Sequence, residues 1–300
     1  MIYTVTFNPA LDYVVFLDEL IPGDINRATR ESIFYGGKGI NVSNVLNTLG
    51  LETTALGFVA GFTGKAIEEG LASIGIRADF IHLPEGNSRI NVKVKHGDET
   101  EINGQGPVIT DEAISALFDK LDTLTADDIL VLAGSIPNTL PDDIYERIMA
   151  RLEGKNIRIA VDATKDLLLN VLKYHPFLIK PNNHELGEMF NTVCKTKEDI
   201  EYYAKELQKK GARNVLISMA GDGAILIPEE GEAIQIGTPK GKVVNSVGAG
   251  DSMVAGFIAG YLKNGSYDEA LKSGTAAGSA TAFSEGLASL EMYQAMLEQI

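Results

Sequence analysis

Short apolar runs and helix-like periodicity alternate along the chain from about residue 108. Residues 111–124 place apolar side chains three and four positions apart, and Thr110 precedes them as a candidate N-cap. The apolar positions are Ile114, Leu117, Phe118, Leu121 and Leu124. The pattern predicts a surface helix that packs through one stripe.

Strands buried on both faces are expected where apolar residues run without interruption. Such runs occupy residues 129–135, 157–163 and 177–182, and residues 214–221 predict a further strand. Helical stretches separate these strands along the chain. The fold class is therefore predicted as α/β, with a mostly parallel sheet between helices.

Two other regions, residues 12–35 and 88–103, alternate apolar and polar side chains as half-exposed strands do. The second folds back around residues 96–99, as a hairpin would. A small sheet cannot bury both faces alone, so we expect it to close over a site as a lid or to pack against a second subunit. We predict a single domain over residues 1–300, with lid segments at about 12–35 and 88–105.

Composition fits this globular fold. The chain has 300 residues, 45% of them hydrophobic and 22% charged, and no segment approaches the roughly 18 consecutive apolar residues of a membrane span. The N-terminus alternates and carries Asp12, so it predicts a strand rather than a signal peptide, and hence a cytoplasmic protein. Cys194 is the only cysteine, which excludes an internal disulfide and a thiolate zinc cluster.

The formal net charge of −15 argues against nucleic acid as a partner, because phosphate backbones are bound by clustered basic residues. An anionic substrate would need cations that are gathered locally. Arg27, Lys38 and Arg89 each lie beside a glycine- or asparagine-rich stretch and are the candidates.

Two glycine-rich stretches each precede a predicted helix. In GGKGIN (36–41), glycines permit close approach of the backbone to a ligand, and Lys38 adds a positive charge. The alternative is a glycine-rich turn whose glycines serve only to allow a positive φ. NSVGAGD (245–251) follows a strand-like segment, 241–244, and its backbone N–H groups would face an anion. Asp251 is either a base that accepts a proton from a hydroxyl or an acidic residue that balances the helix dipole.

Other kinase and hydrolase signatures are missing. The sequence has no G-x-x-x-x-G-K-[ST], no H-R-D set and no G-x-S-x-G. HELGE (184–188) departs from the zinc motif H-E-x-x-H, because Glu188 stands in the place of the second histidine.

Five motifs, taken together and in this order, resemble the ribokinase-like (PfkB) family of sugar kinases. They are NPALD (8–12), GGKGIN (36–41), KPNNHE (180–185), SMAGDG (218–223) and NSVGAGDSMVAGF (245–257), and the resemblance spans nearly the whole chain. It implies a ribokinase-like α/β core with a small β-sheet lid. It also implies transfer of the γ-phosphoryl group of ATP to a sugar hydroxyl, with Mg²⁺.

The resemblance implies residue roles at the sugar side of the site. Asp251 would be the catalytic base, beside an anion hole formed by the backbone of Val247, Gly248, Ala249 and Gly250. The residues implied to bind the sugar are Asp12, Gly37, Lys38, Asn41 and Ser135.

The nucleotide side is implied in the same way. Lys180 and Asn182 would contact the nucleotide phosphates, and Glu185 would organise Mg²⁺. The nucleotide loop would contain Ser218, Ala220, Gly221 and Gly223, with Gly278 and Ser284 near the adenine.

NPALD and SRINVKV (88–94) resemble the hexose-phosphate kinases of the family, in which Arg27 and Arg89 would bind the phosphate already on the substrate. By the same resemblance, RINVK (89–93) implies fructose 1-phosphate as the substrate in preference to tagatose 6-phosphate. The same pockets would also suit a kinase of unphosphorylated sugars or nucleosides, or a non-enzymatic sensor of sugars or nucleotides. The predicted lid segments carry apolar residues that would suit a homodimer formed through the lids, namely Val14, Phe16, Ile90 and Val92.

Overall fold

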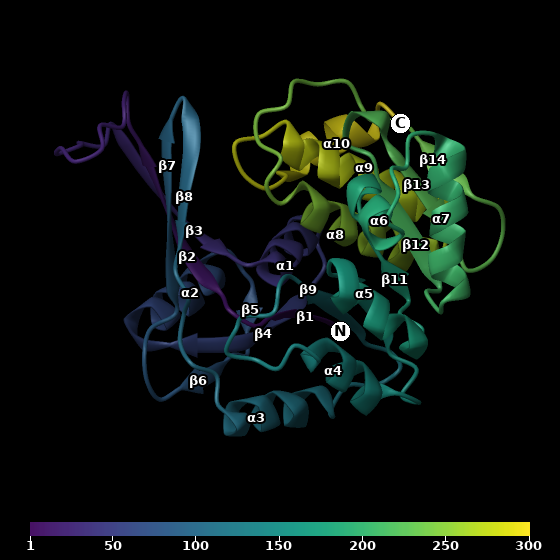
Figure 1. Ribbon diagram of the computed structural model, residues 1–300, viewed down its shortest axis with the longest axis horizontal. Helices are drawn as coiled ribbons and strands as arrows, with labels where there is room; N and C mark the ends of the chain where they lie inside the picture. The colour runs from purple at the N-terminus through teal and green to yellow at the C-terminus, as the bar shows by residue number, and fades with distance from the viewer.

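The computed structural model describes residues 1–300, apart from the side chain of Asp98. Its main sheet has ten strands in the order β14-β13-β12-β11-β10-β9-β1-β4-β5, with β6 paired to β4 (Figure 1). The strands are β1 Ile2–Thr6, β4 Thr53–Ala60, β5 Arg77–Ala78, β6 Ile81–Leu83, β9 Ile129–Ala133, β10 Arg158–Asp162, β11 Leu178–Ile179, β12 Asn214–Ser218, β13 Ala224–Ile227 and β14 Ile234–Ile236. All pairs are parallel except β12–β13 and β13–β14, which confirms the predicted fold class.

The continuous apolar runs divide between two cores. In β9, Leu130 and Leu132 point to one core, while Ile129 and Val131 point to the other. One face of the sheet is covered by α3 Asp111–Leu121, α4 Ile144–Leu152, α5 Lys165–Val171, α6 Asn183–Met189 and α7 Lys197–Lys209. The other face is covered by α1 Lys38–Thr48, α8 Ala249–Asn264, α9 Tyr267–Ala282 and α10 Leu290–Leu297. Because successive side chains of these strands enter one core or the other, both faces of the strands are buried and neither face is polar.

Helix α3 confirms the predicted surface helix, although it ends at Leu121. The Thr110 side chain caps it by accepting from the backbone N–H of Ala113, and the predicted stripe is buried. Residues 241–244 form no strand, so the expected strand before α8 was wrong. Val243 and Val244 are instead exposed in a loop.

A second, four-stranded sheet stands apart from the main sheet, and we call it the small sheet (Figure 1). Its order is β3-β2-β7-β8, with β2 Ala10–Phe16, β3 Arg30–Gly36, β7 Arg89–His96 and β8 Asp98–Asn103. β2 and β7 pair in parallel and the other two pairs are antiparallel, with the predicted hairpin turn at Gly97. Helix α2 Gly61–Ser73 packs beside it, because Tyr35 lies against Gly70.

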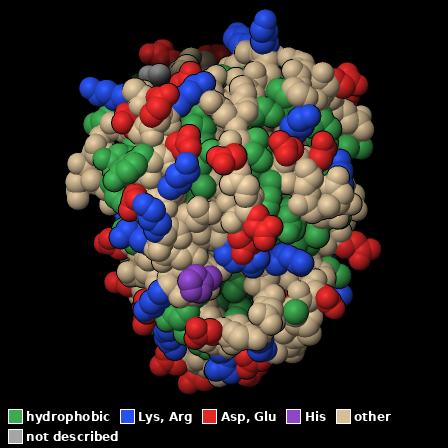
Figure 2. All heavy atoms as spheres, turned by 90° about the vertical axis from the view of Figure 1, so that its right-hand side faces the viewer, with side chains coloured by type: hydrophobic (Ala, Val, Ile, Leu, Met, Phe, Trp, Pro, Cys, Tyr) green, Lys and Arg blue, Asp and Glu red, His purple; other side chains and the backbone are tan. Residues whose placement is uncertain are grey.

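The surface carries charges of both signs. On the face at the α7 and β14 side, acidic and basic side chains are interspersed (Figure 2). Among the described residues, no helix is both long and apolar enough to cross a membrane.

Candidate active site

One cavity of about 490 Å³ lies where the carboxyl ends of the main-sheet strands, the small sheet and the start of α8 meet. Ligands of parallel α/β sheets bind at this edge. Arg89 and predicted residues from all five motifs line the cavity, and the motif residues are Asp12, Gly37, Lys38, Asn41, Lys180, Asn182, Glu185, Ser218, Val247, Gly248, Gly250 and Asp251. Five lining residues were not predicted: Asn91, Lys93, Glu101, Asn103 and Asp162.

The glycine turn of the fifth motif places the N-terminus of α8 at the cavity. Gly248 is the N-cap and has φ 81°, a left-handed conformation that glycine adopts at little cost. A side chain at Gly250 would lie 3.2 Å from Nζ of Lys180, so the lysine reaches the first turn of the helix. The N–H groups of Val247 and Ala249 already donate to Oδ1 of Asn245 and to the carbonyl oxygen of Ser246. The N–H groups of Gly248 and Gly250 therefore converge with the ammonium of Lys180 where an anion would be stabilised.

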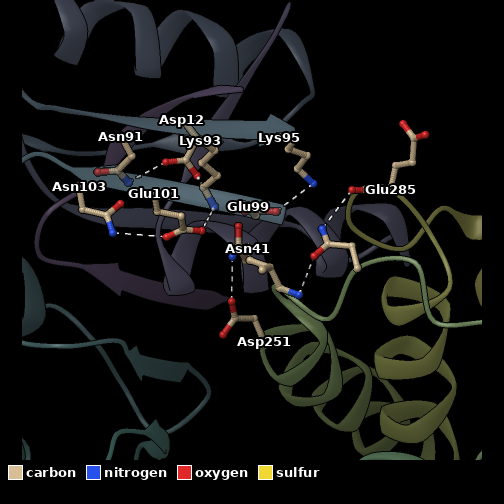
Figure 3. A network of polar contacts seen from close by, with 12 residues as sticks. Asp12, Asn41, Asn91, Lys93, Lys95, Glu99, Glu101, Asn103, Asp251 and Glu285 are labelled. Carbon is tan, nitrogen blue, oxygen red and sulfur yellow. Dashed lines mark hydrogen bonds and ion pairs between the residues drawn. The ribbon is translucent and has the colours of Figure 1, made fainter. Parts of the chain in front are cut away.

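Asp251 lies in the first turn of α8 and is only 5% exposed. Its Oδ2 accepts a hydrogen bond of 2.8 Å from Nδ2 of Asn41, on α1 (Figure 3). Burial and the nearby negative charge of Asp162 raise the pKa of Asp251 to about 7, against the opposing effects of Asn41, Lys38 and Lys180. A carboxylate with this pKa is suited to accept a proton near neutral pH.

Asp162, at the end of β10, joins the two lysines of the site. Its carboxylate lies 3.3 Å from Nζ of Lys38 and 3.3 Å from Nζ of Lys180. Burial opposes its ionisation, but the charges of the two lysines outweigh burial and lower the pKa of Asp162. Asp162 thus remains ionised, holds both ammonium groups at the cavity and keeps a second negative charge near Asp251.

The small sheet forms the opposite wall. Nδ2 of Asn91 donates to Oδ1 of Asp12 over 2.7 Å, and Nζ of Lys93 lies 3.3 Å from Oε1 of Glu101 and 3.9 Å from Oδ2 of Asp12 (Figure 3). Burial raises the pKa of Asp12, against the effects of Lys93 and Asn91. Arg89, the first residue of β7, donates from Nε to the carbonyl oxygen of Asn8 over 2.9 Å.

The N-x-x-E pattern of the third motif forms the start of α6. Asn182 is its N-cap and accepts from the N–H groups of His184 and Glu185, while Oε2 of Glu185 accepts from the N–H of Asn182 over 2.8 Å. The described residues hold no cluster of three or more His, Cys, Asp or Glu that would bind a metal. Mg²⁺ needs no such cluster, because it is typically held by one or two carboxylates, waters and substrate phosphates, and Glu185 and Asp162 fit that donor set.

Several predicted residues lie outside the cavity. Arg27 is exposed in the segment that joins β2 and β3, and Ser135 is exposed after β9. Ala249 begins α8 but does not line the cavity. Ala220 and Gly221 are exposed in the turn Ala220–Asp222, beyond Ser218.

The remaining nucleotide-side residues have evident packing roles. A side chain at Gly223 would meet the carbonyl oxygen of Ile236 at 1.9 Å, so the hairpin β13–β14 requires glycine there. Gly278 is buried in α9, where a side chain would lie 3.1 Å from the carbonyl oxygen of Ala249. Ser284, just beyond α9, donates to the carbonyl oxygen of Ala280 over 2.7 Å.

Comparison with known proteins decides the family. Residues 3–292 match the pfkB family of carbohydrate kinases. The chain belongs to this family. Its pfkB fold is ribokinase-like, and its activity is transfer of a phosphoryl group to a sugar hydroxyl, as the resemblance implied.

Three relatives are similar to the chain over nearly their full length. The 1-phosphofructokinase of Bacillus subtilis is 48% identical over 100% of this chain and 98% of its own. The D-tagatose-1-phosphate kinase of Bacillus licheniformis is 39% identical over 100% of this chain and 98% of its own. The solved phosphofructokinase-2 of Escherichia coli in complex with fructose-6-phosphate has a TM-score of 0.91 and 27% identity, over 99% of this chain and 98% of its own.

Proposed function

We propose that the chain transfers the γ-phosphoryl group of ATP to the 6-hydroxyl of fructose 1-phosphate, forming fructose 1,6-bisphosphate and ADP. The observation that carries this proposal is Asp251, a buried carboxylate at the start of α8 with a pKa of about 7. It shares a cavity with the basic and amide side chains of the small sheet. A proton acceptor and a wall suited to a polar, anionic sugar thus face the same space.

The chain's own groups account for the chemistry. Asp251 accepts the proton of the 6-hydroxyl while O6 bonds to the γ-phosphorus and the bond from this phosphorus to the β,γ-bridging oxygen breaks, releasing ADP. The N–H groups at the start of α8 and the ammonium of Lys180 stabilise the charge on the transferred group. Lys38, held by Asp162, adds a second positive charge beside Asp251.

For the nucleotide, we propose Lys180 and Asn182 at the phosphates and the segment from Ser218 to Gly223 along the bound ATP. Gly278 and Ser284 would act indirectly, because their contacts are with the backbone of α8 and α9. Glu185 and Asp162 would hold Mg²⁺ through water, where the ion would neutralise charge on the phosphates. On the sugar side we propose Asp12, Gly37, Lys38, Asn41 and Arg89.

The sugar is tested by comparing kcat/KM for three sugar phosphates on one preparation, with saturating ATP and Mg²⁺. We expect fructose 1-phosphate to exceed tagatose 6-phosphate, because the 48% identical relative is named 1-phosphofructokinase. Tagatose 1-phosphate is the second candidate, since the 39% identical relative is named for it. Preference for tagatose 6-phosphate, or for sugars without phosphate, would contradict the proposal.

We further propose that the small sheet acts as a lid and mediates a homodimer. The pairing of β2 with β7 corrects the predicted dimer surface. Val14 and Phe16 pair with Lys93 and Lys95 on the cavity side, so they do not share a face with Ile90 and Val92. The opposite face exposes three isoleucines: Ile33, Ile90 and Ile102 are 55%, 41% and 63% exposed. Leu11, Tyr13, Val92 and Val94 extend this outer face by register. An exposed apolar sheet of this kind is typical of a subunit contact.

A further inference from the structure

We propose that Lys93 of β7 binds the phosphate already present on the substrate, and that Glu101 of β8 occupies the position of this phosphate in the free protein. The inference rests on the proposed function, because it names a residue by which a phosphorylated sugar would be recognised. It adds Lys93 to the predicted phosphate-binding arginines, of which Arg89 lines the cavity of this chain and Arg27 does not.

The alternation of β7 places three polar residues on one wall. Arg89, Asn91 and Lys93 lie two positions apart, so their side chains share a face of the small sheet, and all three line the cavity. Arg27 lies outside the cavity, and Nε of Arg89 is bound to a backbone carbonyl. Lys93, whose side chain is 15% exposed, is therefore the second cation of this wall.

The two partners of Lys93 differ in how firmly they are held. Asp12 is fixed by the hydrogen bond from Asn91, and its side chain is 16% exposed. Glu101 belongs to the edge strand β8, its side chain is 38% exposed, and it lies nearer to the ammonium of Lys93 (Figure 3). A phosphate monoester carries more negative charge than a carboxylate, so it can displace Glu101 and leave Asp12 in place.

Asn91 supplies an independent sign that a ligand binds here. The residue is 6% exposed and its Nδ2 donates to Asp12, but its Oδ1 has no hydrogen-bond partner among the described residues. A buried acceptor without a donor is costly, and a sugar hydroxyl on this wall would satisfy it. The wall thus offers an acceptor for a hydroxyl two residues away from a cation for a phosphate.

The substrate's shape matches this separation. In fructose 1-phosphate the phosphate is on C1, at the opposite end of the carbon chain from the 6-hydroxyl. When this hydroxyl faces Asp251 on the α8 side, C1 points toward the small sheet, where Lys93 and Arg89 lie.

The experiment measures KM and kcat for fructose 1-phosphate in the full chain and in Lys93→Met, with saturating ATP and Mg²⁺. We expect KM to rise at least about tenfold in Lys93→Met, with kcat within about threefold of the wild type. The lost hydrogen bond from the ammonium to the substrate phosphate is equally strong in the ground and transition states, so its loss weakens binding without slowing the chemical step. Lys93→Arg restores most of the affinity. Lys95→Met is the matched control, since Lys95 lies two residues further on the same face and pairs with Glu99 outside the cavity.

Glu101→Gln separates phosphate binding from a structural role. If Glu101 competes with the substrate phosphate for Lys93, its removal lowers KM by about threefold or more. If Glu101 instead holds Lys93 in position beside Asp12, its removal weakens this contact and KM rises. Unchanged KM in Lys93→Met, or a rise in KM in Glu101→Gln, overturns the inference. If the wild type prefers another sugar phosphate, the proposed function is wrong, and the inference is then tested by measuring KM of the same variants for that substrate. Activity only on sugars without phosphate overturns both.

Discussion

At the scale of single residues, Asp251 shows how position changes the chemistry of a carboxylate. In isolation, an acidic residue in the first turn of a helix is stabilised by the helix dipole and remains ionised. Here burial and the charge of Asp162 outweigh this effect and raise its pKa to about 7. Asn41 and the two lysines limit the rise, so the group titrates near neutral pH instead of staying protonated.

This shifted pKa predicts a pH-dependent stability. The folded state holds the proton of Asp251 up to about pH 7, while the unfolded state releases it near the ordinary value of 3.8. Protein stability therefore falls as the pH rises through this window. We expect Asp251→Asn, which cannot ionise, to gain on the order of 2–3 kcal/mol in free energy of unfolding relative to the wild type between pH 4.5 and pH 8.

Urea denaturation of both proteins at the two pH values measures this change. Asp222→Asn serves as the control, because Asp222 is an exposed acidic residue in the loop after β12. A stability difference between wild type and Asp251→Asn that is the same at both pH values would contradict the assigned pKa.

Residue patterns predicted the main chemical groups but not all of their partners. Asp12, Lys38, Lys180 and Asp251 stand in motifs, and the structure brings all four to one cavity. Asp162 belongs to none of the motifs, and it reaches Lys180 only because β10 and β11 end side by side. Its position at the end of a buried strand was the available signal.

At the scale of elements, the small sheet shows the limit of a local pattern. Alternation predicted its strands, because each strand's periodicity is local. Which face meets the cavity depends on the pairing of β2 with β7, whose residues lie far apart in the chain. The sequence therefore could not separate Val14 and Phe16 on one face from Ile90 and Val92 on the other, and a shift of one residue exchanges the faces.

The outer face of this sheet predicts the oligomeric state. We expect the wild type to have the mass of two chains in solution by light scattering after size exclusion, and Ile102→Lys to have the mass of one. A charge placed within an apolar interface is left desolvated and unpaired. Val193→Lys is the control, because Val193 is 71% exposed away from the small sheet. A monomeric wild type, or equal masses in all three proteins, would contradict the proposed dimer.

At the scale of the whole molecule, the site exists only where distant segments meet. Asn41 and Asp251 are 210 residues apart, and Asp12 and Asn91 are 79 residues apart, yet each pair is hydrogen-bonded. The parallel sheet makes this possible, because residues at the ends of its strands line one cavity together with residues of the small sheet. The fold class was predictable from strand and helix periodicity, whereas these contacts depend on strand order and register.

The central claim is that this fold phosphorylates fructose 1-phosphate with Asp251 as the base. The most direct measurement follows fructose 1-phosphate, ATP and Mg²⁺ by phosphorus NMR with the wild type and with Asp251→Asn. We predict fructose 1,6-bisphosphate and ADP in equal amounts, with kcat at least about 100-fold lower in a folded Asp251→Asn. Failure of the wild type to form the bisphosphate, or a loss of less than about tenfold in Asp251→Asn, would contradict the account.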